Sequence, residues 1–283
     1  MFILLGEESL FWVYALAKLF DRIVWVFSLA LTAFIIAYVW YITVPSERTI
    51  DTNMPVIFGE RILLPLPRKV SELTVEEAIL LRRSIREYTN EPVNLSDLAM
   101  ILWAAYGITE PKLGFRAAPS AGATYPLEIY VVIGERGVKY SEGFLAGGIY
   151  KYEPHSHTLT LVKGGDYRGE LMGASLGQRW VGEAPLSVVI CAVFERTTWI
   201  YGERGRVRYV PMEAGHAGQN IYLMATALNY GAVVVGAFDD GLVAKIINSK
   251  PEEKPLYVIP IGVPRSPPKT SFEDIWEYIK SRR

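Results

Sequence analysis

The chain is poor in the residues that most often bind metals or carry acid–base catalysis. Among its 283 residues there are one cysteine, Cys191, and three histidines. A single cysteine excludes an internal disulfide, a CxxC redox pair and a cysteine-rich metal site. No H-E-x-x-H motif occurs, and His155 and His157 lie in a predicted turn, where solvated side chains are expected. We therefore predict no metal site.

Glycine-rich phosphate loops and an excess of one charge are also missing. The sequence holds no G-x-G pair and no G-x-x-x-x-G-K loop, which excludes the Rossmann fingerprint and the P-loop. With 29 basic and 30 acidic residues, the chain has no bulk attraction to nucleic acid. GASLG, residues 173–177, matches a hydrolase elbow, but an elbow needs a strand before its serine. Because this segment has a helical pattern, Ser175 is interpreted as structural, and a serine hydrolase is the weakest alternative.

One long run without charge is present near the N-terminus. Residues 23–44, IVWVFSLALTAFIIAYVWYITV, are 22 uncharged residues, and a transmembrane helix needs about 20 mainly apolar ones. Aromatic residues near both ends of the run favour the membrane interface. Glu7 and Glu8 argue against a cleaved signal peptide, which starts with basic residues. We predict a single-pass membrane anchor over residues 1–44, with its helix at 23–44.

Basic residues flank this run almost evenly, so the positive-inside rule leaves its orientation open. A cytoplasmic folded domain is our working expectation. Residues 45–70 carry four prolines and little periodicity, which is typical of a linker. The folded domain is expected over residues 71–283.

Helical and strand patterns mix within the folded domain. Thr74 and Glu77 form a capping-box signature before the helix VEEAILLRR, and the helix LSDLAMILWAAY should stop at Gly107. Further helices are predicted for DYRGELMGASLGQRW, MEAGHAGQNIYLMATALNY and SFEDIWEYIKSRR. Strands are predicted for LEIYVVIG, GIYKYE, TLTLV, LSVVICAVF and PLYVIPIG. Without regular βαβ alternation, this order predicts an α+β domain with a mostly antiparallel sheet flanked by helices.

The segment RRSIREY gathers three arginines and a serine in five positions. If the preceding helix continued, Arg82 and Arg86 would share a face, with Ser84 close by. Guanidinium groups and a hydroxyl suit a phosphate. The alternative is a solvated basic helix end, in which the arginines complement the helix dipole. The spacing alone favours this alternative.

Five segments together resemble the SagB-type branch of the nitroreductase family of FMN-dependent oxidoreductases. RRSIREY is similar to the family's opening signature, and APSAGATYPLEIYVV, residues 118–132, to its second. GIYKYEPHSHTLTLV, EAGHAGQNIYLMATALNYG and GAFDD before PLYVIPIGVP follow in the order expected of that branch. The resemblance covers residues 71–270. It implies a nitroreductase-like fold and a homodimer whose subunits intertwine, with FMN at the interface.

The resemblance also implies which residues hold the cofactor. The flavin phosphate, ribityl chain and pyrimidine edge would contact Arg82, Arg83, Ser84 and Arg86. Of these, Arg86 would lie at the pyrimidine edge, where a cation stabilises negative charge. The partner subunit would line the flavin with Pro119, Ser120, Ala121 and Gly122, small residues that otherwise make an ordinary tight loop.

Two further contacts follow from the same resemblance. The segment whose backbone amide faces flavin N5 corresponds to Gly236 and Ala237, which alternatively form a turn before a helix. The C-terminal basic contact corresponds to Arg265 or Lys269. Separately, polar side chains at helical spacing in an apolar helix need partners if they are buried. They are Glu213, His216, Gln219 and Asn220.

The implied activity is hydride transfer through bound FMN. Because the cofactor carries that chemistry, no catalytic side chain is assigned. NADH or NADPH is the implied electron donor, but many SagB-like proteins instead oxidise azoline rings in modified peptides. The expected substrate is therefore a small molecule or a modified peptide. An alternative of another class is a membrane module that binds flavin or a partner without catalysis.

Overall fold

The computed structural model describes residues 18–20, 24–25, 32 and 56–283. By its internal contacts the chain divides into Met1–Asp51 and Thr52–Arg283, and the fold described below belongs to the second unit. Among the described residues, no helix combines the length and apolar character needed to cross a membrane. The anchor predicted over residues 1–44 lies outside the described part of the chain, apart from the few residues just given.

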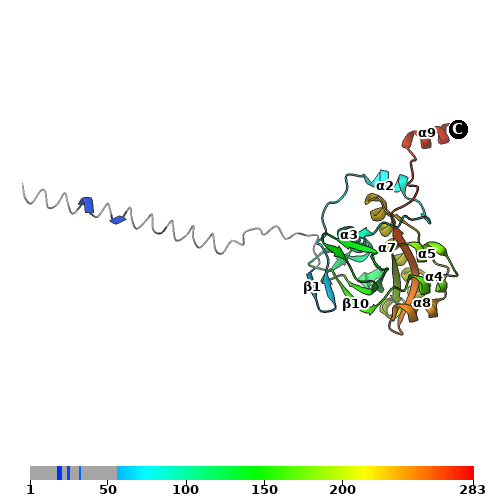
Figure 1. The fold of residues 1–283 in the computed structure, drawn as a ribbon, viewed down its shortest axis with the longest axis horizontal. Coiled ribbons are helices and arrows are strands. Elements are labelled where there is room, and N and C mark those ends of the chain that lie inside the picture. Colours follow the sequence, from blue (N-terminus) through cyan, green and yellow to red (C-terminus); the bar gives the residue numbers. More distant parts are fainter. Residues whose placement is uncertain (1–17, 21–23, 26–31, 33–55) are drawn as a thin grey trace, which may run out of the picture. The chain divides into compact units, whose positions relative to one another are not determined.

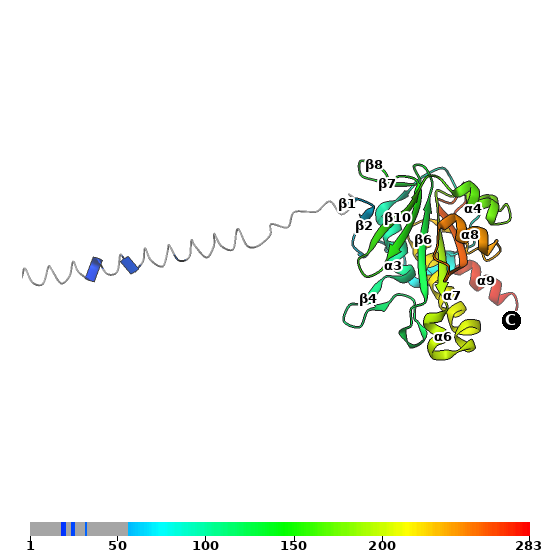
Figure 2. The ribbon, with the colours of Figure 1, turned by 90° about the horizontal axis from the view of Figure 1, so that it is seen from below.

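An eight-stranded sheet forms the centre of this unit (Figure 2), and each of its strand pairs is antiparallel. In spatial order the strands are β1 (Val56–Phe58), β2 (Arg61–Leu63), β10 (Thr158–Gly164), β9 (Gly148–Glu153), β6 (Leu127–Ile133), β11 (Leu186–Val193), β13 (Glu253–Gly262) and β12 (Gly231–Ala232). The continuous apolar run LSVVICAV makes β11, which is buried at all eight positions. A strand buried on both faces needs such a run.

Helices and shorter strands surround this sheet. The helices are α2 (Val75–Leu81), α3 (Leu95–Tyr106), α4 (Arg168–Ala174), α5 (Arg179–Glu183), α6 (Glu195–Tyr201), α7 (Val210–Ala227), α8 (Asp240–Ile247) and α9 (Phe272–Lys280). A 3-10 turn, η1 (Ala121–Ala123), and a π-helical turn, η2 (Gly205–Tyr209), complete them. A small three-stranded sheet contains β3 (Val93–Asn94), β7 (Val138–Tyr140) and β8 (Gly143–Phe144). A two-stranded sheet contains β4 (Ile108–Glu110) and β5 (Phe115–Arg116).

Two hydrophobic cores lie on opposite faces of the large sheet (Figure 1). On one face, α3 and α7 cover Ile129 and Val131 of β6. On the other, α4, α5 and α8 cover Tyr130 and Val132 of the same strand. Successive side chains of a strand point to opposite faces, so one apolar strand supplies both cores. The predicted α+β fold, an antiparallel sheet flanked by helices, is confirmed.

Local capping signals set several helix ends as predicted. At the start of α2, Glu77 N–H donates to Thr74 Oγ1 at 3.3 Å, and Thr74 N–H donates to Glu77 Oε2 at 2.8 Å. The helix α3 begins directly after Asn94 and is capped by Gly107. Ser271 forms a second capping box at the start of α9. Each cap satisfies backbone donors that a helix terminus leaves without an internal partner.

The prediction that α2 continues through residues 82 and 83 is wrong. The helix ends at Leu81, and Arg82 has φ −58° and ψ 125°, which is an extended conformation. The chain leaves the helix because its next residues pair with the sheet: Ile85 N–H donates to Ala232 O at 2.9 Å. Tertiary pairing therefore overrides a local pattern that would have allowed two more helical residues.

The stretch predicted as a linker, residues 45–70, contains part of the large sheet. β1 and β2 form a hairpin, and β2 pairs with β10. Beyond β2, His157 Nε2 lies 3.0 Å from Pro65 O, so this nitrogen is the donor, and Nδ1 accepts from Tyr152 Oη at 2.8 Å. His157 is buried, not solvated as expected, and burial lowers the pKa of its imidazole. The folded unit thus begins before residue 71.

Candidate functional site

An extended arginine segment, residues 82–86, runs beside the edge strand β12. Ser84 forms a parallel bridge with Ala232 of that strand. Alternate side chains of an extended chain point to the same side, so Arg82, Ser84 and Arg86 share one side of the segment. Arg82 and Arg86 thus share a side through strand alternation, about 13 Å apart along the segment, and not through the helical spacing expected from the sequence.

Aromatic rings support two of these arginines. The Arg82 guanidinium lies 5.0 Å from the centre of the Tyr222 ring, whose hydroxyl lies 2.9 Å from Ser84 Oγ. The Arg86 guanidinium lies 5.4 Å from the centre of the Trp180 ring. A ring face attracts a cation and restricts its position while leaving the N–H edges free to donate. The arginine segment is therefore oriented by its own chain.

No carboxylate within residues 56–283 forms an ion pair with an arginine of this segment. Arg83 instead donates to Thr270 Oγ1 at 3.2 Å. Arginines elsewhere do find acids, as Arg168 does with Asp166 at 2.6 Å. Clustered guanidinium groups without carboxylate partners are the setting that a phosphate or another anion requires.

Tyr222 links the arginine segment to the residues expected at flavin N5. Its hydroxyl contacts Ser84 and accepts a hydrogen bond from Val234 N–H at 2.9 Å. Two and three residues further along the chain are Gly236 and Ala237, and the carbonyl of Ala237 accepts from the Gln178 side chain at 2.8 Å. A single residue of α7 therefore joins two segments that are far apart in the sequence.

The two candidates for the C-terminal basic contact also lie near the arginine segment. Arg265 Nε donates to Tyr88 O at 2.8 Å, and Arg265 N–H donates to Glu87 O at 3.0 Å. Lys269 is exposed and directly precedes Thr270, the acceptor of Arg83. The chain after β13 thus contacts Glu87 and Tyr88 through Arg265, and Arg83 through Thr270, the residue that follows Lys269.

The small-residue loop, residues 119–122, belongs to a different part of the chain. Gly122 has φ +60°, and a Cβ there would lie 2.7 Å from Tyr201 Oη, so this position favours glycine. Ser120 Oγ accepts from Tyr125 N–H at 2.9 Å and fixes the other end of the turn. Pro119 and Gly122 are exposed, so the loop presents an uncharged, largely backbone surface.

A buried polar cluster supports this loop from behind. Tyr106 Oη donates to Glu213 Oε1 at 2.5 Å, and the Arg116 guanidinium lies between the rings of Tyr106 and Tyr125, 4.4 and 4.6 Å from their centres. Burial raises the pKa of the Glu213 carboxyl, although the Tyr106 and Ser120 hydroxyls and the Arg116 charge oppose the rise. Glu213, found in the sequence only as a polar residue in an apolar helix, thus has buried partners.

The arginine segment and the small-residue loop lie at different levels of α7. Glu213 supports the loop and Tyr222 supports the arginines, and nine residues of helix correspond to roughly 13 Å along its axis. No hydrogen bond, ion pair or ring contact within residues 56–283 joins the two segments. The two groups of expected cofactor-binding residues therefore occupy separate places along α7.

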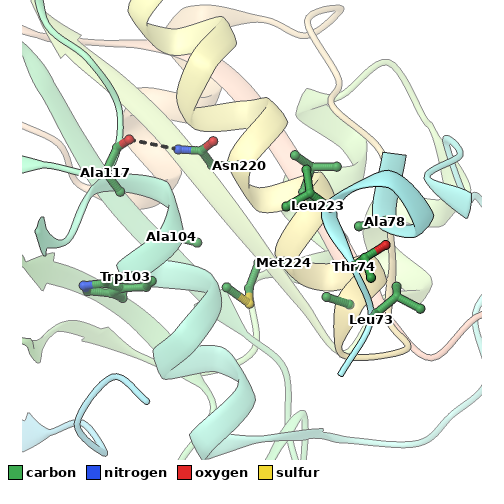
Figure 3. A pocket seen from close by; sticks show the side chains of 11 residues that line it. Leu73, Thr74, Ala78, Trp103, Ala104, Ala117, Asn220, Leu223 and Met224 are labelled. Atoms are coloured by element: carbon green, nitrogen blue, oxygen red, sulfur yellow. Dashed lines mark hydrogen bonds between the residues drawn. The ribbon is translucent and has the colours of Figure 1, made fainter. Parts of the chain in front are cut away.

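A separate pocket of about 300 Å³ lies between α2, α3 and α7 (Figure 3). Its lining includes Trp103, Leu223 and Met224, and none of its eleven lining residues is charged. Asn220 donates to Ala117 O at its rim, at 3.3 Å. An uncharged pocket offers nothing to a phosphate, so the arginine segment, and not this pocket, is the candidate anion site.

The serine of the hydrolase pattern is not a nucleophile. Ser175 is fully buried and caps the C-terminus of α4, so a helix and not a strand precedes it. Leu176 and Gly177 follow with φ +58° and +71°, which breaks the single helix predicted here into α4 and α5. The structure contradicts the serine hydrolase alternative, because an elbow needs an exposed serine after a strand.

Sequence reasoning missed three side chains that organise this region: Gln178, Trp180 and Tyr222. Tyr222 lies within a segment that carries the family resemblance, but nothing in its spacing marks it as different from a core tyrosine. Gln178 and Trp180 follow the mistaken hydrolase pattern. Only the fold shows that they contact the Ala237 carbonyl and the Arg86 guanidinium.

The fold and the site define an α+β protein with an oriented cluster of arginines at the edge of an antiparallel sheet. A model of the nitroreductase family matches residues 79–263. The chain belongs to the nitroreductase family. Membership makes it a flavin oxidoreductase of a family that is typically dimeric and whose cofactor is FMN.

Several proteins are similar to this chain. A predicted nitroreductase of Methanocaldococcus jannaschii is 45% identical over 204 residues, which are 72% of this chain and 98% of that protein. The structure of a predicted nitroreductase from Ralstonia eutropha JMP134 has a TM-score of 0.63 and 28% identity, and the match covers 76% of this chain and 95% of the other.

Peptide-processing proteins are more distant relatives. The microcin B17-processing protein McbC of Escherichia coli is 28% identical over 158 residues, or 55% of this chain and 57% of McbC. A chain of the E. coli microcin synthetase McbBCD complex, solved with truncated pro-microcin bound, has the same fold, with a TM-score of 0.57 and 23% identity over 78% of this chain and 82% of the other.

The residues present fit FMN. Arg82 and Arg86, which no described carboxylate neutralises, share one side of the segment with the Ser84 hydroxyl, and such donors suit a phosphate. The small-residue loop is uncharged and its side chains are small, so its backbone can approach a flat ring closely. The positions predicted for the cofactor stay a proposal, because no contact within the chain tests them.

Proposed function

We propose that this chain is an FMN-dependent oxidoreductase of the SagB-type branch of the nitroreductase family, working as a homodimer attached to a membrane. The arginine segment carries the flavin part of the proposal. Its cations have no carboxylate partner within residues 56–283, and two of them rest on the rings of Tyr222 and Trp180. An oriented, uncompensated cationic cluster at a surface is a binding site for an anionic group.

Each segment has a distinct task in this proposal. Bound FMN supplies the acceptance and donation of hydride. Arg82, Arg83 and Ser84 bind the phosphate and ribityl chain, with Arg265 or Lys269 as a further cation. Arg86 holds the pyrimidine edge, where its charge favours the more negative form of the cofactor. The backbone of Gly236 and Ala237 faces N5.

The second chain completes the site. Its small-residue loop, Pro119, Ser120, Ala121 and Gly122, covers the ring and excludes water without adding charge. Support comes from the separation of this loop from the arginine segment along α7, and from the typically dimeric state of the family. A loop fixed by Ser120 and the cluster around Glu213 keeps its shape when a ring approaches, which limits the entropy lost on binding.

Two substrate classes suit an open flavin face. NADH or NADPH would act as electron donor for reduction of a small molecule. A modified peptide whose azoline ring is oxidised is the SagB-type alternative, and it is supported by the likeness to McbC and to the trifolitoxin operon protein TfxC of Rhizobium leguminosarum, which is 20% identical over 69% of this chain. We favour the peptide class, because the segments of the family resemblance follow the order of the SagB-type branch.

The experiment is to denature the purified protein and identify the released flavin, then to mix the intact protein with each substrate class. We expect a yellow protein that releases FMN and not FAD, because one arginine cluster suits one phosphate. Flavin reduction by an azoline peptide would support the SagB-type assignment, and reduction by NADH or NADPH alone would replace it. A flavin that no donor reduces would indicate a non-catalytic module, and a protein that never binds FMN would overturn the proposal.

Membrane attachment rests on the sequence of residues 23–44, 22 residues without a charge. We propose that these residues anchor the chain and that the folded unit lies on the cytoplasmic side. The full chain should sediment with membranes, whereas a chain without residues 1–44 should be a soluble dimer that keeps its FMN. Labelling of the folded unit by an impermeant reagent added outside intact cells would contradict the cytoplasmic side.

A further inference from the structure

The turn between α4 and α5 contacts both segments that are proposed to hold FMN within one chain. Gln178 Nε2 donates to Ala237 O at 2.8 Å and to Ser175 O at 2.9 Å. The Trp180 ring lies beneath the Arg86 guanidinium at 5.4 Å. Gln178 in this turn therefore contacts the segment proposed to face N5, Gly236 and Ala237 (the N5 segment). Trp180, at the start of α5, contacts the arginine segment.

The backbone of the turn is unusual and firmly held. Leu176 has φ +58°, a left-handed conformation that residues with a Cβ rarely adopt. Two backbone bonds fix it: Gly177 N–H donates to Met172 O at 3.0 Å, and Gln178 N–H donates to Ser175 O at 3.2 Å. Such conformations persist where the surroundings determine them and are concentrated at functional sites. Here the turn directs Gln178 at Ala237.

The N5 segment has little else to fix it. On one side, Val235 and Val258 exchange backbone hydrogen bonds at 2.9 and 3.0 Å. On the other, Asp239 N–H donates to Ala174 O at 2.8 Å. Between these anchors, the carbonyl of Ala237 is held by the Gln178 side chain. Removing that donor would free the peptides on which the contact with N5 depends.

We propose that Gln178 and Trp180 are positioning residues of the FMN site. Gln178 fixes the backbone of Gly236 and Ala237, and Trp180 fixes the guanidinium of Arg86. This inference rests on the proposed function, since it concerns the same cofactor. It predicts opposite effects of the two residues on the reduction potential of bound FMN, which a general loosening of the fold would not produce.

Gln178→Met keeps the length of the side chain but removes its donor. A backbone N–H facing N5 favours oxidised flavin, whose N5 accepts a hydrogen bond, over the reduced form, whose N5 carries hydrogen. We expect the variant to bind FMN about three- to tenfold more weakly, as the loss of one neutral hydrogen bond implies, and to shift the midpoint potential upward. FMN titration and spectroelectrochemistry of the purified dimer measure both.

Trp180→Leu keeps an apolar side chain but removes the ring. We expect FMN binding about two- to fivefold weaker, from the loss of one cation–π contact, and a downward shift of the midpoint potential because Arg86 is held less firmly. Since Trp180 acts through Arg86, the change should have no further effect in an Arg86→Ala background. The matched control is Arg179→Ala, at the first residue of α5, whose exposed side chain pairs with Glu183 alone among residues 56–283 and should change neither quantity.

The outcomes separate this inference from the function on which it rests. Wild type that binds no FMN overturns the proposed function. Wild type that binds FMN, with Gln178→Met and Trp180→Leu equal to it in affinity and potential, overturns the inference alone. Potentials that shift in the same direction, or a Trp180→Leu effect that is undiminished when Arg86 is alanine, would assign these residues to stability and also overturn it. Urea unfolding of each variant establishes that it is folded.

Discussion

The arginine segment and the small-residue loop, which are both proposed to hold FMN, present opposite kinds of surface. The first exposes cations that no described carboxylate neutralises and orients them with the rings of Tyr222 and Trp180. The second exposes no charge and keeps its polar groups behind it, where Tyr106 and Glu213 satisfy each other. Charge at the surface supplies affinity for an anion, whereas a stiff neutral loop supplies shape. Changes in the two regions should therefore have different consequences.

The largest effect is expected for Arg86→Ala. Losing one charge-assisted hydrogen bond to a bound anion costs about 1.5–3 kcal/mol, which is roughly ten- to over a hundredfold in FMN affinity. Arg86→Lys keeps the charge without the planar fork and should lie between alanine and wild type. The free energy of unfolding without FMN should change by no more than about 0.5 kcal/mol, because the side chain is exposed.

Titration of FMN into the three apo proteins, with urea unfolding of each, checks this prediction. Equal affinities would identify these arginines as ordinary surface charge. A large fall in the free energy of unfolding of Arg86→Ala without FMN would mean that the arginine segment stabilises the fold, which would contradict the difference expected between the two regions.

A smaller effect on binding, accompanied by one on stability, is expected for Gly122→Val. A β-branched residue at φ +60° is strained, and its Cβ would meet Tyr201 Oη at about 2.7 Å. The free energy of unfolding should fall by about 1–2 kcal/mol. FMN affinity should fall roughly three- to tenfold as the loop relaxes.

Gly122→Ala, with less bulk, should lie between the valine variant and wild type in both measurements, which are urea unfolding and FMN titration. A valine variant that binds FMN normally but unfolds more easily would remove the small-residue loop from the site.

A mixed dimer tests whether the two regions belong to one site across two chains. In a heterodimer of Arg86→Ala and Gly122→Val chains, a shared site implies one site with both changes and one with neither, by the two-fold symmetry of a dimer. The purified heterodimer should therefore bind about one FMN with wild-type affinity, against about two for wild type. Two tags, one on each chain, allow its isolation. Two weak sites and no tight one would mean that each site lies within a single chain.

The smallest effect is expected for the pH dependence of the free energy of unfolding, which Glu213 behind the small-residue loop should cause. Burial raises the pKa of Glu213 above its usual 4.5, so the folded state keeps a proton that the unfolded state loses first. The free energy of unfolding should then fall as pH rises from about 4.5 through the pKa of the folded state. The fall should be about 1.4 kcal/mol for each pH unit between the unfolded and the folded pKa. In Glu213→Gln, which keeps an acceptor for Tyr106, this fall should be absent.

Urea unfolding at several pH values between 4.5 and 7.5, with exposed Glu203→Gln as the control, measures the difference. A constant gap between wild type and Glu213→Gln across this range would contradict a raised pKa for the buried carboxyl.

The local elements whose signals lie within a few residues could be predicted from the amino-acid sequence. The capping box of Thr74 and Glu77, the end of α3 at Gly107 and the buried run of β11 are each specified by neighbouring side chains, and the structure has them all. The order of the motifs also identified the family, because that order can be read directly along the sequence.

The ends of other elements, and the side chains that they contact, depend on long-range packing. Arg82 leaves the helix because the following residues pair with β12, and α4 stops at the buried Ser175, where a left-handed turn follows. Tyr222, Gln178 and Trp180 reach the candidate site from segments far apart in the chain. Such contacts depend on the packing of distant residues, which spacing along one chain does not encode.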